Sequence, residues 1–126
     1  MTQEDKELLI QDLCARLPYG VICTDSNNTG ELTQISIPHD ICVLEYGDSA
    51  VCSIADCRPY LFPLSSMTEE QKEEYCQLQQ KIIYNSKGVV NDDITEYINW
   101  LNKNHFDYQG LIEKSLAIDA TVKNIY

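Results

Sequence analysis

The fold is decided by residues 21–54, which read VICTDSNNTGELTQISIPHDICVLEYGDSAVCSI. Four short runs, at 21–24, 32–37, 41–46 and 50–54, carry the β-branched and apolar residues that are typical of strands. Turn-forming residues separate these runs. Successive strands with such short connections predict a four-stranded antiparallel meander. Because the strands are short, we expect a strongly curved sheet, of the half-barrel kind.

An amphipathic helix is expected before the strands. Thr2 can cap its first turn, and Pro18 ends it just after Arg16. Helical spacing places five apolar residues on one face, which should contact the sheet: Leu9, Ile10, Leu13, Cys14 and Leu17.

The segment after the meander, residues 58–64 (RPYLFPL), is predicted to be extended, because each proline disfavours a helical residue before it. We expect its large side chains to pack across the sheet. A longer helix then begins after Thr68, which can form a capping box with Gln71. This helix should end near residues 85–88 and bury a stripe made of Tyr75, Leu78 and Ile82.

Two more helices are predicted in the C-terminal third. Asp92 or Asp93 can cap the first, with Trp100 flanking an inward stripe of Ile94, Tyr97, Ile98 and Leu101. Asp107 can cap a short last helix over residues 111–116. The predicted class is therefore α+β: an N-terminal helix, a four-stranded antiparallel sheet, two longer helices and a short C-terminal helix, in one domain over residues 1–126.

The charge of the chain excludes several partners. Its formal net charge is -11, and residues 17–57 contain six carboxylates but no Lys or Arg. Such a surface repels phosphate backbones and anionic lipids, so we expect neither nucleic acid nor membrane binding. A basic protein is the partner that it favours. The six carboxylates, which are candidate binding residues, are Asp25, Glu31, Asp40, Glu45, Asp48 and Asp56.

The six cysteines and the N-terminal sequence indicate a cytoplasmic protein. The first residues, MTQEDK, are polar and acidic and do not resemble an export signal. No apolar run reaches the roughly 18 residues of a membrane span. Cys14 and Cys76 fall in predicted helices, and Cys23, Cys42 and Cys52 fall in predicted strands. We therefore expect reduced thiols in a core rather than a disulfide framework.

Three segments carry a resemblance to a known group of proteins. They read DLCARLPYGV from residue 12, RPYL and SSMTEE within residues 58–70, and WLN, HFDY and GLI within residues 100–112. Together they resemble a family of small uncharacterised proteins of phages, prophages and mobile elements of gut Bacteroides-type bacteria. The chain departs from that pattern at Phe62 and Gln109, where the family has basic residues, and at Asn104, where it has a second histidine. The resemblance implies an origin and a bacterial cytoplasmic setting, and it implies no activity.

A metal site and a thiol enzyme are the chemical alternatives. His39, Cys42, Cys52 and Cys57 are ligand types that a structural zinc site uses, but their spacing lacks the usual knuckles, and strand alternation already accounts for Cys42 and Cys52. A nucleophilic cysteine needs a base and an electropositive setting, and this acidic chain has two histidines, His39 and His105. We therefore expect no catalytic residues, no metal and no cofactor.

Aromatic residues after the third predicted helix form the other candidate protein-binding patch. Trp100, His105, Phe106 and Tyr108 are residue types found at binding hot spots. The favoured interpretation is that Phe106 and Tyr108 anchor the end of the chain onto the core.

The function expected from these observations is non-enzymatic. The chain is predicted to be a small acidic accessory protein that binds a host or phage protein. A sharper hypothesis is that it mimics nucleic acid and inhibits a host factor, which requires the carboxylates to lie on one face. A structural or assembly role in the virion is the main alternative, and a small metal-dependent or thiol enzyme is the weaker one.

Overall fold

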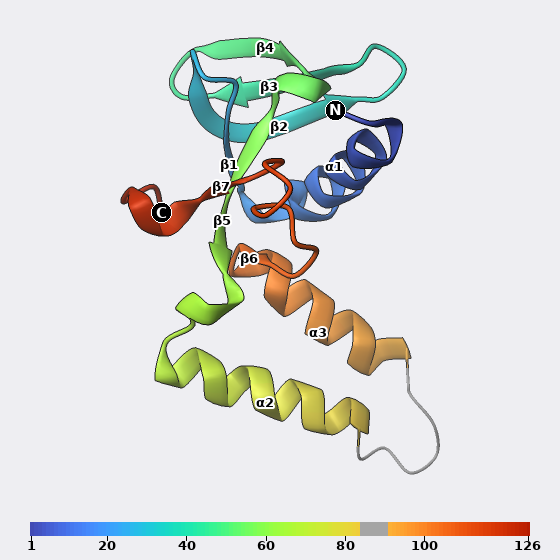
Figure 1. Ribbon diagram of the computed structural model, residues 1–126, viewed down its shortest axis with the longest axis vertical. Helices are drawn as coiled ribbons and strands as arrows, with labels where there is room; N and C mark the ends of the chain where they lie inside the picture. Colours follow the sequence, from blue (N-terminus) through green and yellow to red (C-terminus); the bar gives the residue numbers. More distant parts are fainter. Residues whose placement is uncertain (84–90) are drawn as a thin grey trace.

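The computed structural model describes residues 1–83 and 91–126 (Figure 1). Its helices are α1 (Gln3–Arg16), α2 (Glu69–Ile83) and α3 (Asn91–Lys103), with single 3-10 turns η1 (Leu17–Tyr19), η2 (Ile54–Asp56), η3 (Leu64–Ser66) and η4 (Ala120–Val122). Its strands are β1 (Ile22–Thr24), β2 (Thr29–Ser36), β3 (Ile41–Glu45), β4 (Ser49–Ser53), β5 (Arg58–Pro63), β6 (Phe106–Asp107) and β7 (Ile118–Asp119). The α+β class is confirmed.

Helix α1 begins as predicted, and four of the five residues of its predicted stripe, all but Cys14, contact the core. Thr2 and Asp5 form a capping box at its start. The fully buried side chains are Leu9, Asp12, Leu13 and Arg16, so an acid–base pair shares the inner face with the two leucines. This rotates Cys14 into solvent, and its predicted place on the buried stripe is wrong.

The predicted meander exists, but the sheet is larger. Strands β1–β4 pair antiparallel in sequence order, as the short turns required. The complete sheet has seven strands in the order β4-β3-β2-β1-β5-β6, and β7 also pairs with β5. The four-stranded, all-antiparallel description is therefore wrong, because residues 58–63 form a strand of the sheet instead of crossing it.

Strand β5 joins the two ends of the chain. It pairs antiparallel with β1 and parallel with both β6 and β7. The last antiparallel pair between the two strands joins Cys23 of β1 to Pro59 of β5. One residue further, the Tyr126 hydroxyl accepts a hydrogen bond from the Ile22 N–H (2.8 Å) and donates one to the Tyr60 carbonyl (2.9 Å). The Tyr126 side chain thus bridges the β1 and β5 backbones just beyond the point where their direct pairing ends. We call this bridged boundary the β1–β5 seam.

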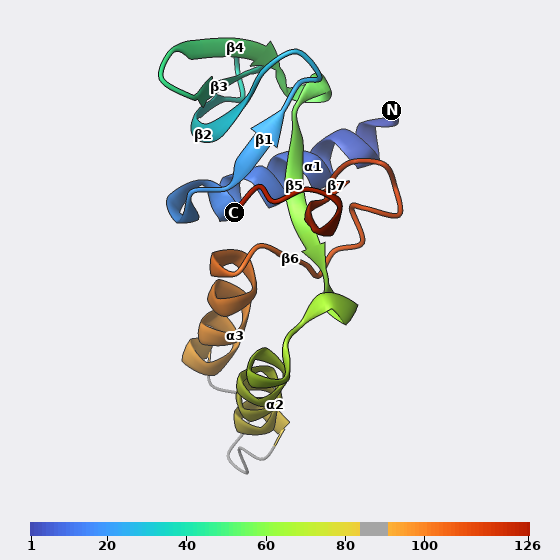
Figure 2. The same ribbon diagram turned by 90° about the vertical axis from the view of Figure 1, so that its left-hand side faces the viewer.

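Helices α2 and α3 form a hairpin that extends away from the meander (Figure 2). The predicted capping box between Thr68 and Gln71 is confirmed. Leu101 is fully buried, whereas Ile94 is 42% exposed, so its predicted inward position is wrong. Position 94 lies near the start of α3, about two helical turns before Leu101, whereas the buried cluster surrounds Leu101 near the other end of the helix. The predicted helix end near 85–88 and the capping side chain of Asp92 lie outside the described residues.

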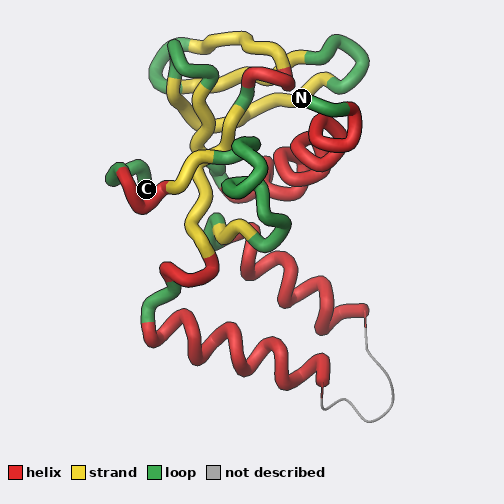
Figure 3. Tube along the Cα trace, in the orientation of Figure 1, coloured by secondary structure: helices red, strands yellow, loops and turns green. Residues whose placement is uncertain are grey.

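Residues 111–117 form turns, and the last helical segment is the short 3-10 turn η4 (Figure 3). Asp107 does accept hydrogen bonds from the Leu111 and Ile112 N–H groups (2.9 and 3.0 Å), as a cap would. The predicted helix over 111–116 is nevertheless wrong, because Gly110 (φ 76°) and Ser115 (φ 60°) take left-handed conformations and close the segment into turns.

Two apolar clusters stabilise the fold. The larger one joins α1 to the inner face of the meander and to the C-terminal turns, through Leu9, Leu13, Leu32, Leu44, Ile54, Leu61 and Leu111 among others. The smaller one lies at the base of the helical hairpin and is built on Met67, Leu101 and Phe106.

Candidate functional site

The outer face of the meander is the surface that α1 leaves uncovered. Leu32, Leu44 and Cys52 point inward and are buried, so the alternating residues of β2–β4 point outward. Register places Gln34 opposite Val43, and Val43 opposite Val51 on β4. Val51 is 62% exposed. The outer face includes Glu31, Gln34, Val43, Glu45 and Val51, which gives a small apolar centre beside two carboxylates.

Glu31 and Glu45 lie directly opposite one another on neighbouring strands. Both are exposed, and neither is in an ion pair within the part of the chain that the structure describes. Like charges opposite one another cost roughly 0.2–1 kcal/mol of sheet stability. The fold therefore places two acidic residues without an ion-pair partner at opposed positions of neighbouring strands on the exposed face, a placement that packing does not require.

The Glu31 side chain lies over Gly20. A Cβ atom at Gly20 would be 3.1 Å from Glu31 Oε1, and the left-handed backbone there (φ 68°) also favours glycine. The open turn after α1 thus leaves room for the carboxylate on the outer face.

The other four carboxylates of the acidic segment lie in turns. Asp25 Oδ1 accepts hydrogen bonds from the Asn27 and Asn28 N–H groups (3.0 and 2.6 Å), and these bonds hold the pKa of Asp25 below its usual value. Asp40 pairs with Lys6 of α1 at 2.9 Å. Asp48 and Asp56 are exposed.

These positions divide the acidic residues between the two ends of the meander. The turns that hold Asp25 and Asp48 are adjacent, because the Tyr46 hydroxyl in one donates to Asn28 Oδ1 in the other (2.9 Å). Asp40 and Asp56 lie at the opposite end, where the Ile54 N–H donates to the Asp40 carbonyl (3.2 Å). The carboxylates do not share one face, and this distribution lacks the regular array that mimicry of nucleic acid requires.

The predicted aromatic patch is used inside the molecule. Phe106 is 2% exposed, and Trp100 stacks on it with ring centroids 5.6 Å apart. The Trp100 indole N–H also donates to Glu74 (2.8 Å). His105 stacks on Tyr126 at 4.0 Å. The Tyr108 hydroxyl donates to Asn102 at 2.9 Å. These contacts agree with the anchoring interpretation.

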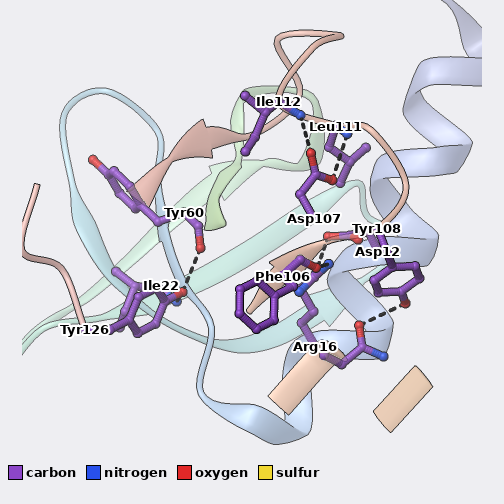
Figure 4. Close-up of polar contacts among 11 residues, drawn as sticks. Asp12, Arg16, Ile22, Tyr60, Phe106, Asp107, Tyr108, Leu111, Ile112 and Tyr126 are labelled. Carbon is purple, nitrogen blue, oxygen red and sulfur yellow. Dashed lines mark hydrogen bonds and ion pairs between the residues drawn. The ribbon is translucent and has the colours of Figure 1, made fainter. Parts of the chain in front are cut away.

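A buried ion pair, which sequence reasoning missed, lies behind these aromatics (Figure 4). Arg16 Nε donates to Asp12 Oδ2 at 2.8 Å, and both side chains are fully buried. Arg16 also lies over the Tyr108 ring, 5.3 Å from its centroid. Burial raises the pKa of Asp12, and the Arg16 charge opposes that rise. The available signal was an acid and a base four residues apart between the buried leucines.

Four cysteines gather in the larger core. Cys57 is hydrogen-bonded to both Cys23 and Cys42, and Cys42 is the cross-strand partner of Cys52. Burial raises the pKa of Cys52 to about 11, and the hydrogen bonds with burial raise those of Cys42 and Cys57 as well. The thiols of Cys42, Cys52 and Cys57 therefore stay protonated and unreactive at neutral pH.

The histidine of the proposed metal set lies apart from these thiols. His39 is exposed and contacts the Ser36 hydroxyl at 2.7 Å. Within residues 1–83 and 91–126, no three His, Cys, Asp or Glu side chains are arranged to hold a metal ion.

A hollow of about 470 Å³ lies between η3 and the loop after β6, lined in part by Ser65, Asp107, Tyr108 and Glu113. Asp107 is 9% exposed, and its two oxygens accept the backbone N–H groups of Leu111 and Ile112. Its carboxylate is thus committed to holding the loop.

The chain matches no protein-family model, no curated protein and no solved structure. The resemblance to small phage and mobile-element proteins thus stays a prediction. None of the helices in the described ranges has the length and apolar character that crossing a bilayer demands.

Proposed function

We propose that the protein acts by binding another protein that carries a basic surface. The observation that carries this proposal is the unpaired couple Glu31 and Glu45 beside exposed Val51 on the outer face. An apolar centre flanked by charge is the usual composition of a protein interface. A cationic side chain of a partner would relieve the repulsion between the two carboxylates, and attraction to the net charge of -11 would speed association.

The proposal is non-enzymatic and includes the setting that the resemblance implies. The partner would be a host or phage protein in a bacterial cytoplasm. Cysteines stay reduced in that compartment, and all six cysteines of this chain are free thiols. Nucleic-acid mimicry is left out, because the carboxylates are divided between two ends of the meander.

A charge-matched pair of variants tests the proposal. Glu31→Gln with Glu45→Gln neutralises the outer face, and Glu70→Gln with Glu73→Gln removes the same charge from the exposed side of α2. Each protein is immobilised and exposed to lysate of the bacterial host, with and without infection, at low and high salt. We expect one stoichiometric basic protein on the wild type and on the α2 variant. It should be lost from the outer-face variant and at high salt.

Retention of the same partner by the outer-face variant would overturn the assignment of this surface. Capture of no partner by the wild type at any salt would overturn protein binding itself.

A further inference from the structure

Strand β4 is the end of the sheet, and its outer edge has no partner among the described residues. The Ile54 N–H donates to the Asp40 carbonyl, and the Tyr46 N–H donates to the Asp48 carbonyl. Backbone hydrogen bonds alternate along an antiparallel pair. The N–H and C=O groups of the even-numbered residues of β4 therefore point toward β3. The backbone N–H and C=O groups of Ser49, Val51 and Ser53 therefore face away from the sheet.

This edge lacks the features that normally prevent strand pairing. Proteins protect free edges with charged residues, prolines, bulges or a covering element. Residues 49–55 (SAVCSIA) contain neither a charge nor a proline, and the β3–β4 register has no shift. The one irregularity of the meander lies between β2 and β3, at Leu32 and Gln34. Among the described residues β4 has β3 as its strand neighbour, and the exposure of Val51 shows that its outer face is uncovered at the middle of the strand.

A second copy of this chain fits the edge poorly. Antiparallel pairing centred on Val51 would place Asp48 opposite Ile54 and Tyr46 opposite Asp56. At each end of this two-strand interface, carboxylates from both copies would lie close together. Residues 17–57 contain no Lys or Arg to neutralise them. The carboxylates of Asp48 and Asp56, which flank the edge, therefore favour a basic strand over a second copy of this chain.

We propose that β4 binds an extended basic segment of its partner by strand addition. The segment carries an apolar residue opposite Val51 and a Lys or Arg two positions away, opposite Ser49. Both side chains then lie on the outer face, because alternate residues of a strand share a face. Ser49 is the cross-strand partner of Glu45, and its small side chain lets the cation reach across to that carboxylate.

This inference rests on the proposed function and specifies the partner's chemistry. Backbone hydrogen bonds along the edge would supply affinity, and the alternating apolar and basic positions would supply specificity.

The first experiment uses a synthetic peptide, Thr-Lys-Thr-Val-Thr-Lys-Thr, and amide hydrogen exchange of the intact protein. We expect exchange at Ser49, Val51 and Ser53 to slow by about tenfold or more at saturating peptide, while Cys52, whose N–H faces β3, changes little. A peptide with Glu in place of Lys should give no protection. Absence of protection at millimolar peptide, or equal protection by both peptides, would overturn the proposal.

The second experiment separates strand addition from protein binding in general. Val51→Lys places a like charge at the centre of the edge, Val51→Thr keeps a β-branched residue there, and Gln80→Lys adds the same charge to exposed α2. We expect Val51→Lys alone to weaken capture of the partner by about tenfold or more. Equal capture by all three variants would overturn strand addition while leaving the proposed function standing. A wild-type dimer in sizing chromatography that Val51→Lys dissociates would instead identify a second copy as the occupant.

Discussion

Arg16 Nη2 donates a 2.6 Å hydrogen bond to the backbone carbonyl of Phe106, 90 residues further along the chain. Arg16 ends α1, which belongs to the larger apolar cluster, and Phe106 begins β6, which belongs to the smaller one. The guanidinium is fully buried between the two clusters. This charged side chain therefore helps to hold the helical hairpin against the body of the protein, together with the pairing of β5 and β6.

Asp12→Ala should be strongly destabilising. It leaves the Arg16 charge buried without its carboxylate, and removal of one partner from a buried ion pair costs about 3–5 kcal/mol. Replacing both charges, by Asp12→Leu with Arg16→Met, should cost less than the single change. Urea unfolding of the three proteins measures this difference. A double variant that is less stable than Asp12→Ala would show that the unpaired charge is not the cause.

His105 should make the protein less stable in acid. Burial, together with the nearby Arg16 charge, lowers the pKa of His105 from 6.5 to about 4. Between these values the unfolded chain binds a proton that the folded chain does not, so the free energy of unfolding falls as the pH falls.

His105→Asn should remove this contribution and make stability less dependent on pH between 6.5 and 4. Asparagine also tolerates the left-handed backbone at this position (φ 61°). Urea unfolding across that window compares the two proteins, and parallel curves would contradict the prediction.

Leu101→Ala and Trp100→Ala should differ in cost. Leu101 is fully buried, and truncation of such a residue costs roughly 2–5 kcal/mol. Trp100 is half-buried and contacts Phe106 and Glu74 at the edge of the same cluster. We therefore expect a smaller loss for Trp100→Ala. The reverse order of melting temperatures would refute this helix phase.

Thiol labelling should divide the six cysteines into two groups. Cys14 and Cys76 are exposed, and the other four are buried with raised pKa values in Cys42, Cys52 and Cys57. A thiol reagent such as Ellman's should modify Cys14 and Cys76 rapidly in the folded protein and all six after denaturation. Rapid labelling of Cys42 or Cys57 under native conditions would show that the core opens.

Tyr126→Phe should weaken the seam between β1 and β5. It deletes the hydroxyl that joins the Ile22 N–H to the Tyr60 carbonyl and keeps the ring that stacks on His105. The expected loss is about 1 kcal/mol for two backbone groups left without their partner at the surface. Hydrogen exchange at Ile22 should accelerate, whereas Tyr46→Phe, which removes an exposed hydroxyl bonded to Asn28, should leave Ile22 unchanged.

Local signals predicted the elements that local forces determine. The cap at Thr2, the capping box at Thr68 and the turns of the meander are each specified within a few residues, and the structure contains them. Strands β6 and β7 have two residues each, which is too short for any periodicity, and they exist because β5 offers both edges. Only tertiary structure could reveal them.

The candidate site was predicted in part. The acidic segment was evident, and Glu31 and Glu45 of that segment do meet on the outer face. Their pairing depends on the register of β2 and β3, which sequence spacing does not specify. Phe106 had two interpretations at the level of sequence, because aromatic side chains serve equally well as hot spots and as internal anchors. Its burial agrees with the favoured interpretation, an internal anchor.

The positions of β6, β7 and Tyr126 in the sequence determine when β5 acquires its neighbours during biosynthesis. Ribosomes release a chain N-terminus first, at roughly 5–20 residues per second, so the meander and β5 emerge before β6, β7 and Tyr126 have been made. In that interval the nascent β5 has one edge on β1 and the other open to mispairing. Residues 106–126 then add β6, β7 and the Tyr126 hydroxyl to β5, so this strand stays incompletely paired until the later segment has been made.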